Sequence, residues 1–339
     1  MSKKLLDVFK GIVPDTPPLW MMRQAGRYLP EYRKIREKHP FLEMVCNPEL
    51  ATEITLQPIK RFGFDGAILF SDILVIPEAM GMKLNFFEGR GPVFDSPVKT
   101  KADVANLNIE SIKGNLSYVG EALNLIKTAM PRETTLIGFA GAPFTLACYM
   151  IEGQSSKEFI KIKSFMYQQE PAFNTLMEKL SHALVDYIEL QIQSGAEVIQ
   201  LFDTFGGILS PSDYQRYCLA PTRQIFSRLK ERFPETPLIY FVKAGRNMYS
   251  LIADFPIDGL GVDWMTPLSE ATTLPFVVQG NLDPMVLFSN KSVIDREVAR
   301  IKAEGKHAKG HIFNLGHGIL PQTPLENVEY LCEAVRGLG

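Results

Sequence analysis

The sequence predicts a (β/α)8, or TIM, barrel, because eight short apolar segments alternate with helical stretches along the chain. Several of these segments are continuous apolar runs, as expected for parallel strands that are buried on both faces. The eight predicted strands cover residues 19–22, 67–71, 136–140, 198–202, 238–242, 259–262, 276–279 and 312–315. The first and sixth have the least distinct pattern, so an open doubly wound sheet is the alternative architecture.

The predicted helices between the strands carry start and stop signals. Residues 47–62 begin with Asn47 and Pro48, a favourable N-cap and first-turn pair. Residues 171–194 place apolar side chains at helical spacing and end at Ser194 and Gly195. Three further helices are predicted over residues 211–232, 284–304 and 324–337.

An insertion is predicted after the second strand. Residues 81–98 read as a hairpin whose turn is Gly89-Arg90-Gly91. The rest of the chain contains no linker, repeat or low-complexity segment. We therefore expect residues 1–339 to form a single α/β domain.

The composition excludes several classes of protein. The 339 residues carry a formal net charge of −2, so no global field attracts nucleic acid or an anionic membrane. No apolar run is long enough to span a bilayer. The cysteines, Cys46, Cys148, Cys218 and Cys332, are widely spaced, which argues against structural zinc or a disulfide framework. A reducing, cytoplasmic location is expected.

The end of the first predicted strand is rich in groups that bind anions. The apolar run 19–22 passes directly into Arg23, Gln24, Ala25, Gly26 and Arg27. A guanidinium group is always charged and matches a carboxylate with a planar fork, while glycine lets a backbone approach a ligand closely. The stretch thus indicates an anion-binding loop for a substrate with several carboxylates. The alternative is two surface arginines at a helix start.

Polar residues also follow the other predicted strands, where barrel enzymes place their reacting groups. From the second strand onward these are Asp72; Gly141, Ala142 and Pro143, with Tyr149 slightly later; Asp203 and Thr204; Lys243 and Arg246; Asp263; Gly280 and Asn281; and His317. This pattern predicts one cleft at the carboxyl ends of the strands.

Each candidate residue also has a structural interpretation. Asp72 has apolar neighbours, so it is either a helix N-cap or a carboxylate that needs a cation or several donors. By spacing alone Tyr149 is a core residue, Thr204 an N-cap and Arg36 a solvated helix charge. His317 stands between two glycines, which favours a side chain outside the core.

Four blocks of sequence resemble the uroporphyrinogen decarboxylase family. The first, Met22 to Glu31, reads MRQAGRYLPE and is similar to the family's signature. The others are Phe70–Val75, Ala140–Thr145 and Asn314–Gly318. Together they reach from near the start of the chain to near its end.

The resemblance implies an activity and a site. The family converts the four acetate side chains of uroporphyrinogen III to methyls without a metal or organic cofactor, and it forms homodimers. By the resemblance, Asp72 holds the pyrrole N–H groups of the macrocycle and acts in catalysis with Arg23 and Arg27. The implied substrate contacts also include Gln24, Ala25, Gly26, Arg36, Tyr149, Thr204 and His317.

Two alternatives come from other classes of protein. A barrel methyltransferase of the corrinoid or methionine-synthase type would bind zinc through closely spaced His and Cys. The cysteine nearest to His317 is Cys332, and no H-x-C motif occurs. A non-catalytic tetrapyrrole carrier would keep the arginines but would not need Asp72.

Overall fold

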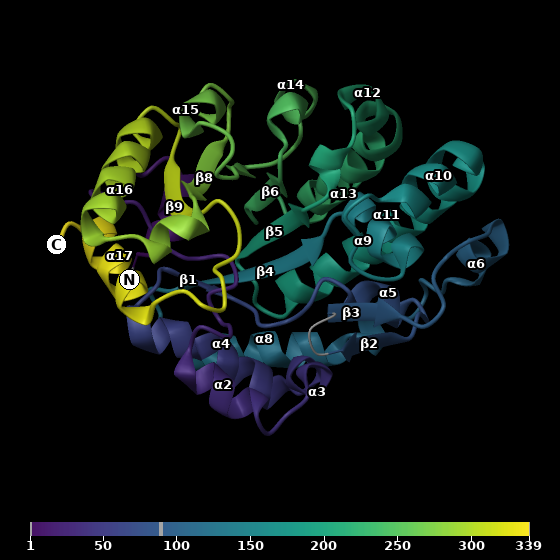
Figure 1. Ribbon diagram of the computed structural model, residues 1–339, viewed down its shortest axis with the longest axis horizontal. Helices are drawn as coiled ribbons and strands as arrows, with labels where there is room; N and C mark the ends of the chain where they lie inside the picture. The colour runs from purple at the N-terminus through teal and green to yellow at the C-terminus, as the bar shows by residue number, and fades with distance from the viewer. Residues whose placement is uncertain (1, 88–90, 339) are drawn as a thin grey trace.

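A curled seven-stranded parallel sheet forms the centre of the computed structural model, which describes residues 2–87 and 91–338 (Figure 1). Its strands run in the order β1-β4-β5-β6-β7-β8-β9. Their bounds are β1 Gly66–Ile68, β4 Thr135–Gly141, β5 Val198–Asp203, β6 Leu238–Val242, β7 Gly259–Gly261, β8 Val277–Leu282 and β9 His311–Leu315. Seven of the eight predicted strands are therefore confirmed, with small differences at their ends.

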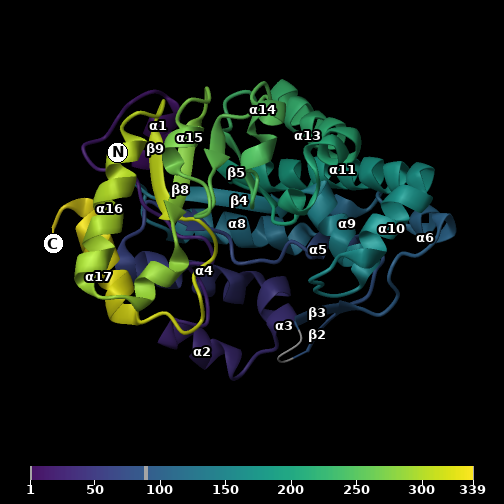
Figure 2. The same ribbon diagram turned by 45° about the horizontal axis from the view of Figure 1, so that its top comes forward.

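Helices cover the outer face of the sheet (Figures 1 and 2). The first part of the chain contributes α1 Lys4–Phe9, α2 Pro30–Arg36, α3 Phe41–Cys46, α4 Pro48–Phe62, α5 Val75–Ala79, α6 Lys101–Asn106, α7 Ile112–Asn115, α8 Ser117–Ala129 and α9 Pro143–Glu152. The remainder contributes α10 Ile160–Gln168, α11 Glu170–Gln193, α12 Pro211–Asp213, α13 Leu219–Arg232, α14 Tyr249–Ile252, α15 Leu268–Ala271, α16 Lys291–Gly305 and α17 Leu325–Arg336. No helix of the described residues combines the length and apolarity needed to cross a membrane.

Three polar side chains meet inside the curl of the sheet. The Gln279 amide on β8 donates to the Gln200 side-chain oxygen on β5 at 2.8 Å, although β6 and β7 separate these strands in the sheet. The Trp20 indole N–H donates to the Gln279 side-chain oxygen at 2.9 Å. All three residues are fully buried. Strands that are not neighbours can share such contacts only if the sheet is strongly curved.

The strand predicted over residues 19–22 is wrong as a regular strand. The structure has one parallel bridge there, between Leu19 and Phe313 of β9. The backbone N–H of Leu19 bonds to the Asp65 carboxylate at 2.8 Å, and side-chain amides bind the N–H groups of Met21 and Met22. Because side chains take these donors, a backbone ladder does not continue past Leu19.

Two predicted helices are interrupted. The helix expected over residues 211–232 consists of α12, a π-helical turn at Tyr214–Cys218, and α13. The helix expected over residues 284–304 is a 3₁₀ turn at Pro284–Phe288 followed by α16. The second interruption has a cause in the sequence. The Asn290 side chain caps α16 by accepting from Val293 N at 3.1 Å, so a new helix begins there.

The inserted hairpin is confirmed. β2 Leu84–Phe87 pairs antiparallel with β3 Gly91–Phe94, and the hairpin lies apart from the central sheet, beside α3 (Figure 2). The Phe86 and Phe41 rings join it to α3, with centroids 4.5 Å apart. Most of the predicted turn, residues 89 and 90, lies outside the described residues.

Candidate active site

Buried amides fix the segment that carries Arg23 and Arg27. Gln24 is fully buried; its side-chain oxygen accepts from Met21 N at 3.1 Å, and its amide donates to the carbonyl of Gly66 on β1 at 2.9 Å. On the other side, the Asn314 side-chain oxygen on β9 accepts from Met22 N at 3.0 Å. The segment is therefore attached to both β1 and β9.

The Arg23 side chain lies against the loop that follows β9. A Cβ added to Gly318 would lie 2.3 Å from Arg23 Cδ, so only a glycine leaves room for the arginine stem. Arg23 itself has a φ of 62°, a left-handed conformation that non-glycine residues seldom adopt. Backbone strain of this kind is concentrated at functional sites. Its exposed guanidinium is therefore held at a defined place beside the His317 loop.

Asp72 follows β1 and is half-buried. Its carboxylate accepts from Leu74 N at 2.8 Å, which closes a turn ahead of α5. α5 itself begins at Val75 and has no side-chain cap. Burial raises the pKa of Asp72, while the Leu74 N–H and the positive charge of Arg23 act in the opposite direction. The N-cap interpretation of Asp72 therefore fails, although its carboxylate does order the local turn.

The charges of Asp72 and Arg23 both act on Tyr149, which lies on α9. Burial raises its pKa to about 12; the Asp72 carboxylate adds to the increase and Arg23 opposes it. Its ring packs on Phe205 with centroids 5.3 Å apart. The tyrosine hydroxyl is thus protonated at neutral pH and can donate a hydrogen bond.

His317 is a neutral imidazole at neutral pH. Burial, together with the positive charges of Arg23 and Lys243, lowers its pKa to about 3. Its ring lies 6.2 Å, centroid to centroid, from those of Phe241 and Trp264. The structure therefore brings Arg23, at the end of the first predicted strand, and His317, after the last, into one neighbourhood.

Arg27 and Arg36 lie near Tyr32 on the surface of the protein. Both are exposed, and both positive charges oppose the effect of burial on the pKa of Tyr32, which is raised. The Tyr32 ring meets Phe70, two residues before Asp72, with centroids 5.8 Å apart. Arg36 also donates to the carbonyl of His39 at 3.0 Å.

The remaining predicted residues differ in what they offer a ligand. Thr204, at the end of β5, is half-buried beside Phe205. Ala25 and Gly26 are half-buried within the arginine loop. Gln24 does not direct its side chain into the site, because both ends of its amide are used inside the protein.

The sequence did not predict the hydrogen bonds around Asp203, the residue before Thr204. The Thr145 hydroxyl on α9 donates to the Asp203 carboxylate at 2.7 Å and accepts from Phe205 N at 3.1 Å. The Tyr240 hydroxyl donates to the other Asp203 oxygen at 2.9 Å. Burial raises the pKa of Asp203 to about 6 against these donors. The position of Asp203 at a strand end was a usable signal; its partners were not predictable from spacing.

Aromatic rings from three adjacent strands pack against one another and reach His317. Phe139 of β4 meets Phe202 of β5 with centroids 5.9 Å apart, and Phe202 meets Phe241 of β6 at the same distance. Phe241 in turn contacts His317. Trp264, which no sequence pattern indicates, is one residue beyond the strand-end residue Asp263.

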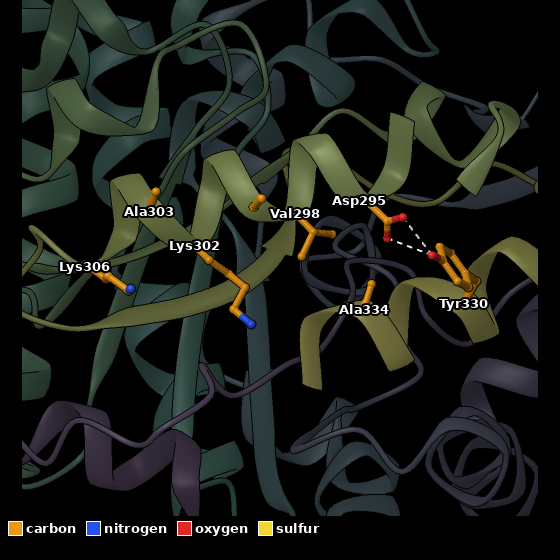
Figure 3. A pocket seen from close by; sticks show the side chains of 8 residues that line it. Asp295, Val298, Lys302, Ala303, Lys306, Tyr330 and Ala334 are labelled. Atoms are coloured by element: carbon orange, nitrogen blue, oxygen red, sulfur yellow. Dashed lines mark hydrogen bonds between the residues drawn. The ribbon is translucent and has the colours of Figure 1, made fainter. Parts of the chain in front are cut away.

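Two other features lie outside this site. A hollow of about 390 Å³ opens between α16 and α17, with Lys302, Asp295 and Tyr330 among the lining residues (Figure 3). The Tyr330 hydroxyl donates to Asp295 across it. Residues 2–87 and 91–338 contain no group of three or more His, Cys, Asp or Glu placed to hold a metal ion.

The fold is that of a barrel-like α/β protein, and the positive charges of Arg23 and Lys243 lie near His317 beyond the carboxyl ends of its strands. The family model for uroporphyrinogen decarboxylase (URO-D) matches residues 1–338. A uroporphyrinogen decarboxylase of Legionella pneumophila (strain Corby) is 48% identical over 96% of this chain and 94% of its own length. One of Geotalea daltonii is 45% identical over 100% and 99%. The chain belongs to the uroporphyrinogen decarboxylase family.

Solved structures of other proteins share the fold. A methyltransferase from Methanosarcina mazei superposes with a TM-score of 0.81 at 21% identity and covers 98% of this chain and 97% of its own. A B12-independent methionine synthase from Shewanella sp. W3-18-1 gives 0.58 at 10% identity, over 95% and 94%. At such identities the likeness concerns architecture alone, and the family membership does not favour the methyltransferase alternative.

Proposed function

We propose that this protein is a carboxy-lyase that converts the four acetate side chains of uroporphyrinogen III to methyls. The products are coproporphyrinogen III and four molecules of CO₂, and the reaction belongs to haem biosynthesis. The observation that carries the proposal is the half-buried Asp72 carboxylate within the field of Arg23, in a chain of this family. A carboxylate that is kept out of water needs a partner, and a ring of pyrrole N–H groups supplies several donors.

The substrate itself provides the electron sink, so the proposed reaction uses no cofactor. Protonation of an electron-rich pyrrole at the carbon that bears the acetate gives a cation. The carbon–carboxylate bond then breaks, its electron pair neutralises the ring, and CO₂ leaves. A second proton converts the resulting methylene to a methyl group, and the ring carbon then releases the first proton to restore the pyrrole. One proton is therefore gained overall for each CO₂ lost.

The proposed roles follow from charge and position. Asp72 binds the pyrrole N–H groups and stabilises the cationic ring. Arg23 and Arg27 are exposed guanidiniums that hold acetate and propionate groups, each as a charged fork. Both act on binding and on the orientation of the carboxylate that leaves.

The other contacts are neutral or peripheral. Tyr149 and Thr204 donate hydrogen bonds to substrate carboxylates, and the neutral His317 imidazole offers one N–H donor. Arg36 adds positive charge at the outer edge. Ala25 and Gly26 bring the backbone close, whereas Gln24 contributes by fixing the loop.

We further propose that residues 18–20 close the sheet into a (β/α)8 barrel and that the chain is one domain. The supporting contacts lie on both sides of this segment. Phe313 N on β9 donates to the Pro18 carbonyl at 2.9 Å, and Asp65 N, just before β1, donates to the Leu19 carbonyl at 2.9 Å. Trp20 adds the interior bond to Gln279.

The proposed assembly is a cytoplasmic homodimer with facing clefts. Free thiols at all four cysteines suit a reducing compartment. Met265, Met285 and Phe288 lie on the loops that follow β7 and β8, and 51%, 56% and 40% of their surfaces are exposed. Exposed apolar residues beside a site are typical of a surface that another chain covers.

The test of the activity is anaerobic incubation with uroporphyrinogen III, followed by a mass-spectrometric count of product carboxylates. We expect the number of carboxylates per tetrapyrrole to fall from eight to four. A tetrapyrrole carrier would return the substrate with all eight, and that result would rule out the proposed function.

A further inference from the structure

We propose that Lys243 binds a carboxylate of the substrate, as a second cation beside His317. The proposal rests on the proposed function and deepens it, since it assigns one more contact within the same site. Lys243 directly follows β6, and its backbone N–H donates to the Asp203 carbonyl at 3.1 Å. The side chain therefore starts from the same edge of the sheet as Thr204.

The ammonium group is held over an aromatic face. Lys243 Nζ lies 5.5 Å from the centroid of the Trp264 ring, and this ring meets His317 edge-on at 6.2 Å. The loops after β7 and β9 touch closely here, because a Cβ on Gly316 would lie 2.3 Å from Trp264 N. Arg23 packs on the next glycine along, Gly318. These contacts form an arc from Arg23 through His317 and Trp264 to Lys243.

Neither acidic residue on the neighbouring strands neutralises Lys243. The Asp203 carboxylate at the end of β5 is bonded to Thr145 and Tyr240, and Asp263, which follows β7, has other partners. Its carboxylate accepts hydrogen bonds from the backbone N–H groups of Ala244 and Met265 and, at 3.2 Å, from the Thr266 hydroxyl. It is only 1% exposed. Asp263 thus holds the Lys243 loop against the Trp264 loop without pairing with the ammonium group.

A third acid on this rim also has another partner. Glu270 pairs with Arg246, three residues after Lys243, at 2.5 Å. Within residues 2–87 and 91–338, Lys243 forms no salt bridge or hydrogen bond through its ammonium group, although the side chain is half-buried. The following residue, Ala244, has a φ of 54°, so the loop is strained as well as attached.

A half-buried ammonium without an acid is unfavourable unless a ligand supplies the negative charge. Arg23 and Lys243 both act on His317, so two positive charges share this part of the site when it is empty. A carboxylate bound between them would relieve their repulsion. Uroporphyrinogen carries eight carboxylates, more than Arg23 and Arg27 can hold. The contact on Trp264 keeps the ammonium in place without reducing its charge.

Equilibrium binding separates this role from a packing role. The probe is uroporphyrin, the air-stable octacarboxylate, titrated by fluorescence into wild type, Lys243→Met and Lys243→Arg. Met preserves the apolar stem over Trp264 and removes only the charge. Lys291→Met is the matched control, because Lys291 lies over the Tyr330 ring at 4.4 Å on α16, away from the site.

We expect Lys243→Met to bind uroporphyrin about tenfold more weakly, as loss of one charged hydrogen bond predicts. Lys243→Arg should recover most of the affinity, and Lys291→Met should match wild type. Added salt should reduce the difference in affinity between wild type and Lys243→Met. Lys243→Met should also show a raised KM for uroporphyrinogen with a smaller change in kcat, and Lys291→Met should leave both at the wild-type values.

Unchanged binding by Lys243→Met would overturn the proposal, as would a lower thermal midpoint with normal affinity, which indicates packing alone. Failure of the proposed function looks different: the wild type itself would then leave uroporphyrinogen intact. Binding of uroporphyrin is measured without turnover, so the two results can be told apart.

Discussion

Two opposing influences act on the carboxyl group of Asp72. Burial raises its pKa, and Arg23 together with the Leu74 N–H lowers it. If the ionised form is the active one, activity is present above the pKa and is lost as the pH falls through it. The net raised pKa therefore places the acid limb of kcat/KM at a higher pH than an exposed aspartate would.

Arg23→Gln should move this acid limb further. Removing the positive charge removes one influence that lowers the pKa of Asp72, so the limb should shift to higher pH, in addition to any loss of rate. The measurement is the pH profile of kcat/KM. Arg27→Gln serves as comparison, since Arg27 is not among the groups that act on Asp72. A limb that stays at the wild-type position in Arg23→Gln would show that the two side chains do not interact.

Arg27 tests the importance of the guanidinium fork. Its side chain is exposed, so its replacement should leave the fold intact. Arg27→Ala should raise KM for uroporphyrinogen about tenfold, and Arg27→Lys less, because lysine keeps the charge and loses the fork. Steady-state kinetics at two salt concentrations provides the check. Equal KM values for Ala and wild type would refute the anion-loop interpretation.

Among the elements, the arginine segment depends on a side chain that sequence patterns do not reveal. Gln24 is fully buried and links Met21 N to the Gly66 carbonyl. Gln24→Ala would leave both groups unpaired, and we expect a loss of about 2–4 kcal/mol in the free energy of unfolding. Urea unfolding measures it, with the exposed Gln168→Ala as control. Equal midpoints for the two variants would show that this amide does not stabilise the segment.

Buried runs of apolar residues made seven strands predictable, because a strand that is covered on both faces leaves a compositional trace. The segment at 19–22 has the same trace but no ladder, since side chains of Asp65, Gln24 and Asn314 bind its N–H groups. Strand-end positions indicated Asp72 and His317. Contacts between distant loops, such as Lys243 on Trp264, depend on the folded geometry and have no signal in spacing.

The Asp203 carboxyl group at the end of β5 should make the stability of the protein depend on pH. Burial raises the pKa of Asp203 from its usual value of 3.8 to about 6 in the folded protein, so the folded state holds the proton more tightly. The contribution of this group to stability is therefore greatest at low pH and declines as the pH rises through 6. Between pH 4 and pH 7 the free energy of unfolding of the wild type should fall by up to about 3 kcal/mol relative to that of Asp203→Asn. Urea unfolding at several pH values measures this difference, and parallel curves would contradict the raised pKa.

For the whole molecule, we expect the chemistry of the substrate to take the place of a cofactor. Turnover should survive dialysis against a strong chelator and need no added metal. The assay is the carboxylate count on dialysed protein. Activity that is lost on dialysis and restored by a metal would show that the proposed mechanism lacks a component.

We expect the fold to hold the Asp72 carboxylate under a ring that becomes cationic. Asp72→Asn keeps the shape and removes the charge. Binding of coproporphyrin should persist through the arginines, while turnover of uroporphyrinogen should fall by about 10²–10³, the usual effect of removing one preorganised electrostatic group. The decisive measurement is turnover and coproporphyrin affinity on the same preparation of this variant. Near-normal turnover would rule out the charge-stabilising role, because Asp72 would then order only its local turn.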